Sequence, residues 1–244
     1  MPLGINGWEL AAALAIVLVG GMVQGAVGFG LNLIVVPVLA ILAPGSVPGS
    51  MVVLSMPMTL TMLLREHHAI DWPGVRWIAI GRIPGTLAGV AVVAAVPTAE
   101  LAIVVGVSII IGVVLSVVHP GIAVTPRSGL TVGTVAGITG TAAGVDGPVL
   151  ALLYQHHEPH TLRATLATCF LIGAAVSGTA LALAGELSIE QLELTAILLP
   201  AMLVGLALSG QVARHLRPAL LRPLVLTFAT IAGCVALGRG ITAI

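Results

Sequence analysis

The sequence predicts an all-α, polytopic membrane protein: a helical bundle of two inverted repeats, each holding one glycine-broken helical hairpin and three transmembrane helices. The first observation behind this prediction is composition. Of the 244 residues, 58% are hydrophobic and 7% are charged, with nine Lys+Arg against nine Asp+Glu. A soluble domain carries about 25% charged residues, so this chain cannot cover a water-facing surface. The same composition excludes a disulfide-rich secreted scaffold, a disordered tail and a nucleic-acid binder.

The second observation is the pattern of the apolar runs, which lack the alternation of an outer-membrane barrel strand. In lipid, the remaining structure that satisfies every backbone polar group is the helix. The third observation is that one order of elements occurs twice. A glycine-broken apolar segment is followed each time by three spans of about 20 residues, the length that crosses a bilayer. We therefore expect a multi-pass protein of the cell membrane.

The first repeat is predicted at residues 1–122. Its broken segment, 8–43, is apolar but is interrupted by five glycines. Three unbroken apolar spans follow, at 47–64, 77–96 and 101–118. A polar loop that contains Arg65 and Arg76 separates the first two spans, and a tight Pro97-Thr98 turn separates the last two.

The second repeat is predicted at residues 123–244 and follows the same order. Its broken segment, 130–154, again holds five glycines. Three spans follow, at 164–184, 194–212 and 219–238. An offset of 116 residues aligns the halves without a gap and places Gly28 on Gly144, Pro84 on Pro200 and Gly89 on Gly205. Chance matches in a glycine-rich chain are the alternative, but the repeated order of elements favours a duplication.

Loop charge predicts that the two repeats have opposite orientations. All of the cations are arginines, and cytoplasmic loops of membrane proteins are enriched in basic residues. Loops that carry arginine, and are therefore placed inside, include 65–76, 155–163 and the basic loop with Arg214, Arg217 and Arg222. The Pro97 turn and the loop 185–193 carry none and are placed outside. If each broken segment enters and leaves on the same side of the membrane, each repeat crosses the membrane three times, and the second repeat starts on the side opposite to the first. Arg239, which this arrangement places outside, is the one arginine that departs from the enrichment of basic residues inside.

The two breaks are the predicted substrate site. Glycine lets the backbone approach a ligand closely, and a helix that restarts at a break directs unpaired N–H groups into it. Short, interrupted segments at matching places in two inverted halves indicate a transporter's binding site, here one suited to a small anion. Close helix packing is the alternative role for such glycines. The predicted substrate-binding residues are Gln24, Gly25, Gly28, Gly30, Asn32, Gly140, Gly144, Gly147 and Arg82.

The glycine spacing resembles that of the sulfite exporter TauE/SafE family. The first break has Gly-x-x-Gly-x-Gly and then Pro37, and the second has Gly-x-x-x-Gly-x-x-Gly-Pro. The resemblance extends over nearly the whole chain, in length, span pattern and duplication. It implies transport of small sulfur-containing or organic anions across the cell membrane. The family usually has a longer glycine run at each break, which Leu31-Asn32 and Asp146 interrupt here.

Asp146 is the one acidic residue deep in an apolar segment, where ionisable groups are costly and usually functional. A carboxylate repels an anion, so we predict a proton-coupling role in which Asp146 is protonated while the anion is bound. An N-cap at Asp146-Gly147-Pro148 is the alternative, and the two are compatible. Arg82 either snorkels to the cytoplasmic side, pairs with Asp146 or contacts substrate.

Other polar residues have more ordinary interpretations. Gln24 and Asn32 either donate to the anion or bond between helices. Hydroxyl bonds to their own helix backbone explain most of the Ser and Thr residues at 55, 59, 61, 165, 168 and 177. The histidines at 67, 68, 156, 157 and 160 are interpreted as loop residues, with pH sensing as the alternative.

We expect no catalytic residue, metal or cofactor. The expected partners are a small anion, the lipid bilayer and protons as the coupling ion, and a homodimer stays open. The first alternative function is a channel for a small anion or neutral solute. A second is an intramembrane enzyme, or a subunit without transport of its own.

Overall fold

The chain folds into a bundle built entirely of helices over the residues that the structure, a computed structural model, describes: 5–118, 121–215 and 218–242. Arg217 of the predicted basic loop lies outside them. The α-helices of the first half are α1 (Gly7–Val27), α2 (Leu31–Leu42), α3 (Gly49–Glu66), α4 (Trp72–Ala95) and α5 (Thr98–Val118). Those of the second half are α6 (Pro126–Ala143), α7 (Gly147–Tyr154), α8 (Pro159–Leu183), α9 (Ile189–His215) and α10 (Pro218–Thr242).

Both predicted helix breaks are present, and glycine conformation explains them. Gly28 ends α1 and Gly144 ends α6 in the left-handed region, with φ of 102° and 70°. Residues that carry a side chain rarely adopt this backbone conformation, so a glycine suits the end of a helix. Each broken segment is therefore a hairpin of two helices joined by a turn of three residues.

The two helices of each hairpin differ in length, which sequence reasoning did not anticipate. The two broken segments, at 36 and 25 residues, are shorter than the roughly 40 residues that two full crossings need, so the sequence predicts short or half-depth helices that meet at each break. Instead α1 has 21 residues and α6 has 18, whereas α2 has 12 and α7 has 8. At a rise of 1.5 Å per residue, α1 is about 31 Å long, enough to cross a bilayer. The half-depth prediction therefore fits α2 and α7 only.

Six helices within the described residues are long and apolar enough to cross a membrane: α1, α4, α5, α8, α9 and α10. The span predicted at 47–64 forms helix α3, which is not among the six. Arg65 and Glu66 at its end, together with its hydroxyl residues and Pro57, lower its hydropathy, and nine of its 18 residues are buried inside the bundle. Helix α3 therefore lines the interior of the protein more than it faces lipid.

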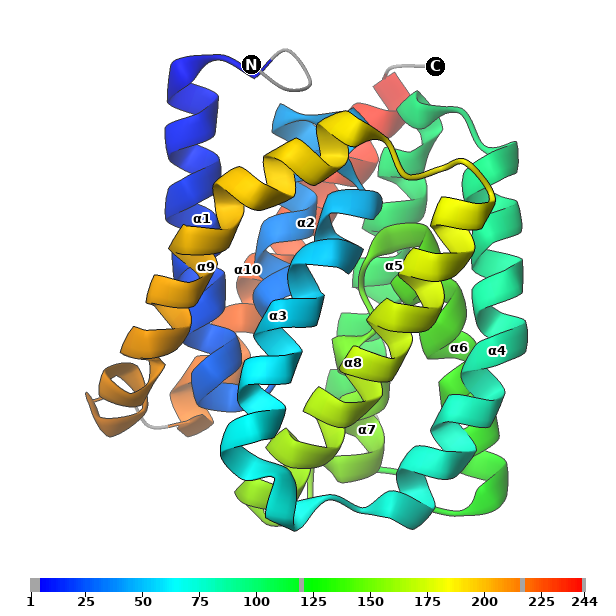
Figure 1. The fold of residues 1–244 in the computed structure, drawn as a ribbon, viewed down its shortest axis with the longest axis vertical. Helices are drawn as coiled ribbons and strands as arrows, with labels where there is room; N and C mark the ends of the chain where they lie inside the picture. The colour runs from blue at the N-terminus through cyan, green and yellow to red at the C-terminus, as the bar shows by residue number, and fades with distance from the viewer. Residues whose placement is uncertain (1–4, 119–120, 216–217, 243–244) are drawn as a thin grey trace.

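Glycines bring the long helices into close contact. Gly81 and Gly85 of α4 face backbone carbonyls of α6, and Gly21 and Gly205 bring α1 and α9 together in the same way. In Figure 1, α4 runs beside α6, and α9 crosses α1. The short helices α2 and α7 lie inside this frame, where every residue from Pro148 to Tyr154 of α7 is buried. The packing alternative thus holds for several glycines outside the breaks.

Candidate functional site

The two helix breaks meet inside the bundle. Asn32, in the first turn of α2, donates a hydrogen bond from Nδ2 to the carbonyl oxygen of Gly144 at 2.6 Å. The residues in this contact are 112 positions apart in the chain. The ends of α1 and α6 and the starts of α2 and α7 therefore surround one place.

A cavity of about 30 Å³ lies at this place. Such a volume holds about two water molecules. Both breaks contribute to its wall, and α3, α4 and α8 complete it. Eight of the ten predicted site residues line it: Gln24, Gly30, Asn32, Arg82, Gly140, Gly144, Asp146 and Gly147.

The other two predicted residues lie outside this cavity and have packing contacts. A Cβ at Gly25 would lie 2.5 Å from the Cβ of Ser209, so this glycine lets α1 approach α9. A Cβ at Gly28 would lie 2.9 Å from Cγ of Arg163, at the start of α8. Gly28 also needs its left-handed conformation to end α1.

Arg82 and Asp146 form a buried ion pair at the cavity. Nη2 of Arg82 lies 2.6 Å from Oδ2 of Asp146, and the two side chains are 3% and 11% exposed. Of the roles considered for Arg82, snorkelling is therefore wrong and pairing with Asp146 is confirmed. Asp146 occupies the N-cap position of α7 but makes no capping hydrogen bond, because its carboxylate turns to Arg82 instead.

Two glycines make room for this pair. A Cβ at Gly173 of α8 would overlap the guanidinium of Arg82, and a Cβ at Gly140 would lie 2.7 Å from its Nη2. The slot therefore exists because neither position carries a side chain. Gly140 was predicted from the break, whereas nothing in the sequence around Gly173 distinguishes it from a packing glycine.

The polar groups of the cavity are not fully satisfied within the described residues. Nε and Nη1 of Arg82, like Oδ1 of Asn32, are buried without a hydrogen-bond partner. An unpaired buried donor loses its hydration without compensation, and more so when it carries charge. These groups therefore favour a polar ligand that fits between them.

Gln24 has a structural contact as well as a place in the wall. Its Oε1 accepts a hydrogen bond from the backbone N–H of Leu31 at 3.0 Å and so caps the start of α2. The interhelical role considered for Asn32 is likewise present in its bond to Gly144. These bonds use Oε1 of Gln24 and Nδ2 of Asn32, and they leave Nε2 of Gln24 and Oδ1 of Asn32 for other contacts.

Most of the hydroxyl residues bond to their own helices, as predicted. Ser55, Thr59, Thr61 and Thr168 donate to backbone carbonyls three or four residues earlier. The exceptions join helices. Ser177 contacts the hydroxyl of Thr141 at 2.7 Å, and Thr165 accepts from the backbone N–H of Asp71.

Sequence reasoning missed the aromatic part of the wall. Phe29 lies inside the first break, and Phe170 faces the cavity from α8. The chain has only three phenylalanines, so Phe29 within a glycine-rich break was a usable signal. Among the described residues, no group of three or more His, Cys, Asp and Glu is placed to hold a metal ion.

Comparison with known proteins gives one finding. A protein-family model described as "Sulfite exporter TauE/SafE" matches residues 12–236, which is most of the chain. No curated protein and no solved structure matches.

Proposed function

Because the chain belongs to the sulfite exporter TauE/SafE family, we propose that it carries a small sulfur-containing or organic anion across the membrane by alternating access. The family is one of membrane transporters and not of enzymes, and six apolar helices fit a multi-pass protein. The anion binds between the two helix breaks, in contact with Arg82.

Arg82 carries this proposal. Its guanidinium is buried, lies in the wall of the central cavity and has two nitrogen atoms without a partner among the described residues. A guanidinium binds oxyanions through parallel N–H···O bonds, which are stronger when the donor is charged. An oxyanion that takes the place of the carboxylate at Nη2 also accepts a hydrogen bond from Nε or from Nη1, which share an edge with Nη2, and it balances the positive charge.

The size of the cavity supports a moving site. A cavity of about 30 Å³ holds about two waters, fewer heavy atoms than a sulfur oxyanion contains. On this proposal the site widens to admit the anion. Movement of one bundle of helices against another around a central site widens the site in transporters built from inverted repeats.

Helix contacts support a duplication that relates the two halves by a two-fold exchange. If the halves correspond in chain order, α1 matches α6 and α4 matches α9. Helix α4 packs against α6, and α1 packs against α9, so each contact becomes the other when the halves are exchanged. The contacts α2·α10 and α5·α7 exchange in the same way, while α3·α8 and α5·α10 join matching helices.

Glycine contacts favour a register between the halves that differs in part from the predicted offset. Gly85 faces the carbonyl of Thr134, and Gly205 faces the carbonyl of Leu18 in the same manner. Thr134 and Leu18 are 116 residues apart, as predicted, but Gly85 and Gly205 are 120 apart. The contacts thus pair Gly205 with Gly85 rather than with Gly89, a shift of about one helical turn.

In this register the ion pair joins the two halves and has no symmetric counterpart. Contacts of Gly137 with the carbonyl of Arg82 and of Gly21 with the carbonyl of Met202 pair Arg82 with Met202. The residue that matches Asp146 at the offset of 116 is Gly30, and both are N-caps. Among the described residues, a symmetric frame therefore surrounds an asymmetric site, whose cation Arg82 has Met202 as its counterpart.

We assign proton coupling to Asp146. An anion that takes Arg82 as its partner leaves the Asp146 carboxylate beside a second negative charge. Repulsion between like charges in a buried site favours the neutral form of the acid, so proton uptake accompanies anion binding. Release of the anion returns Arg82 to ionised Asp146 and restores the observed pair.

Uptake into proteoliposomes tests the function. Sulfite, thiosulfate, an alkylsulfonate and acetate are offered with and without a pH gradient. We expect saturable uptake of at least one anion, driven uphill by the gradient. Failure of every anion to enter refutes the proposal, and flux that is downhill and unsaturable supports the channel alternative.

The matched variants are Arg82→Gln and Arg76→Gln. Losing hydrogen bonds to a charged group costs about 1.5–3 kcal/mol, which corresponds to roughly a 10- to 150-fold fall in uptake efficiency for Arg82→Gln. Arg76 is exposed and lies 5.5 Å from the ring centroid of Trp77, so its replacement changes a charge outside the cavity. Equal losses in both variants contradict a specific role for Arg82.

A further inference from the structure

A second, larger cavity lies on the other side of the end of α1. Its volume is about 290 Å³, and its wall includes Ala26 of α1, Met62 and Arg65 of α3, Arg163 of α8 and Ser209 of α9. These residues belong to the end of the bundle that loop charge assigns to the cytoplasm. The cavity is large enough for a small anion with its hydration water.

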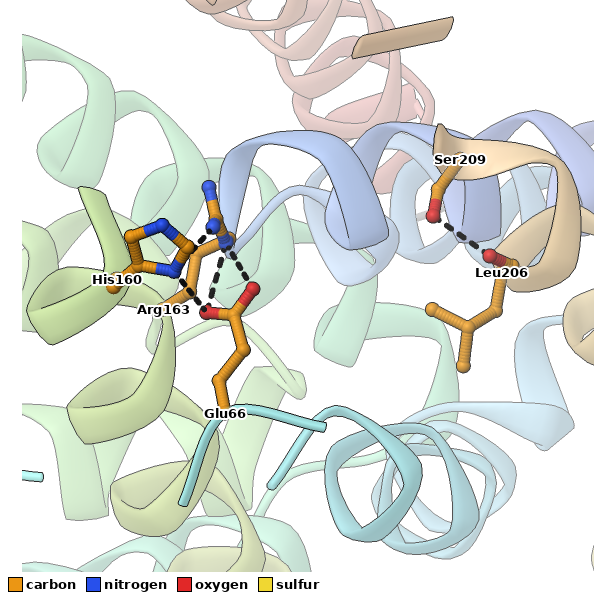
Figure 2. A network of polar contacts seen from close by, with 5 residues as sticks. All are labelled: Glu66, His160, Arg163, Leu206 and Ser209. Atoms are coloured by element: carbon orange, nitrogen blue, oxygen red, sulfur yellow. Dashed lines mark hydrogen bonds and ion pairs between the residues drawn. The ribbon is translucent and has the colours of Figure 1, made fainter. Parts of the chain in front are cut away.

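Arg163 is held at this cavity by a contact on one side of its guanidinium. Its Nε donates to both carboxylate oxygens of Glu66, at 2.8 and 3.0 Å. His160 lies beside the pair, with Nδ1 at 3.3 Å from Nη2 of Arg163. Figure 2 shows one terminal nitrogen of Arg163 directed away from Glu66. With His160 neutral, Arg65, Glu66 and Arg163 leave one net positive charge at the cavity.

Only the last turn of α1 separates the two cavities. Gly25 and Ala26 face the larger cavity, whereas Gln24, Phe29 and Gly30 line the central one. The start of α8 rests on this turn, since a Cβ at Gly28 would lie 2.9 Å from Cγ of Arg163. Arg163 is therefore a cation placed between the central site and this end of the bundle.

We propose that Arg163 forms a second binding site for a small oxyanion in this cavity, at which the anion displaces Glu66 on its way to or from Arg82. The role in transit rests on the proposed function, whereas the binding itself does not. Arg163 and Glu66 are 19% and 24% exposed, and ion pairs in contact with water contribute little to stability. Replacing the Glu66 carboxylate with an oxyanion that binds Arg163 in the same geometry therefore costs little free energy.

A binding site and a structural tie predict different results when the pair is broken from either side. If the pair only holds α3 to α8, removing Arg163 and removing Glu66 have the same effect. If Glu66 competes with the anion, Arg163→Gln weakens anion binding and Glu66→Gln strengthens it. The direction of the change thus separates the two roles.

Equilibrium binding of radiolabelled sulfite to the purified chain, without oxygen, tests this site. The background is Arg82→Gln/Asp146→Asn, which removes both buried charges of the central pair together. We expect weak, saturable binding to remain in this background and to be lost when Arg163→Gln is added. Adding Glu66→Gln instead tightens it about tenfold, as expected for the loss of a competing charged partner. Adding Arg76→Gln, the control, changes nothing.

Each outcome decides the proposal. Absence of residual binding in the background, or weakening by Glu66→Gln as well as by Arg163→Gln, overturns the second site. If the wild-type chain transports anions but the variants give either of these results, the second site is refuted and the proposed function stands. If the chain binds sulfite at Arg163 but transports no anion, the second site stands and the proposed function is refuted.

Discussion

Arg82 and Asp146 determine the character of the central cavity, because each is a charged residue inside a segment that is otherwise apolar. Their contact of 2.6 Å joins α4 to the start of α7. Removing one partner of a buried pair leaves an uncompensated charge, which costs more than removing both. The pair therefore contributes to stability and to the site at once, and the two contributions can be separated.

The first prediction concerns the stability of this pair. Arg82→Gln and Asp146→Asn each lower the free energy of unfolding, by about 3–5 kcal/mol for a fully buried pair. The double variant loses less than the sum, since neither charge is left alone. Thermal unfolding of the four proteins in one detergent measures this. Additive losses contradict a direct interaction.

The second prediction concerns Gly173. A Cβ at this position would overlap the guanidinium of Arg82, so Gly173→Ala displaces Arg82 from its slot. We expect a fall in anion uptake of about tenfold or more, together with a loss of about 1–3 kcal/mol of stability from overpacking. Gly238→Ala on α10 is the control, because a Cβ there meets nothing within 4 Å. Unchanged uptake by Gly173→Ala refutes the slot.

At the scale of elements, α7 is attached to α4 at both of its ends. Asp146 at the start of α7 pairs with Arg82 of α4. At the other end, the hydroxyl of Tyr154 donates to Oδ2 of Asp71, the N-cap of α4, at 2.9 Å. Together with the glycine contacts between α4 and α6, these bonds make α4, α6 and α7 one packed unit.

The third prediction tests the second of these attachments. Tyr154→Phe removes the hydrogen bond and leaves Oδ2 of a partly buried carboxyl without its donor, at a cost of about 1–3 kcal/mol. We expect faster amide hydrogen exchange in α7 and a lower unfolding temperature. Thr131→Val, which removes an exposed hydroxyl bond within α6, is expected to change neither. Unaltered exchange in α7 contradicts the attachment.

The breaks show what sequence can predict about the elements. Glycine spacing placed Gly28 and Gly144 in the helix breaks, because where a helix ends depends on local backbone conformation. The length of α1 and the interior position of α3 were not predicted, since both depend on which neighbours cover each helix. For the same reason Phe170 and Gly173 were missed: the packing of α8 brings Phe170 to the cavity wall and Gly173 to the guanidinium of Arg82.

At the scale of the whole molecule, corresponding loops of the two proposed halves lie at opposite ends of the bundle (Figure 1). Helix α1 begins and α10 ends at one end of the molecule, where the α8–α9 loop also lies (Figure 1). The α3–α4 loop lies at the other end. The α3–α4 and α8–α9 loops follow matching helices, so a parallel duplication places them on the same side of the membrane and an inverted one on opposite sides.

The fourth prediction uses this difference. Cysteines are introduced one at a time as His68→Cys, Glu158→Cys and Glu186→Cys, in a background without Cys169 and Cys234. A thiol reagent that does not cross membranes is then added to intact cells or to inside-out vesicles. We expect His68→Cys and Glu158→Cys to react only in inside-out vesicles, because their loops carry Arg65 and Arg163. Glu186→Cys, in a loop without arginine, reacts only in intact cells. If His68→Cys and Glu186→Cys react from the same side of the membrane, the two repeats are parallel. That result excludes a substrate site between two halves of opposite orientation.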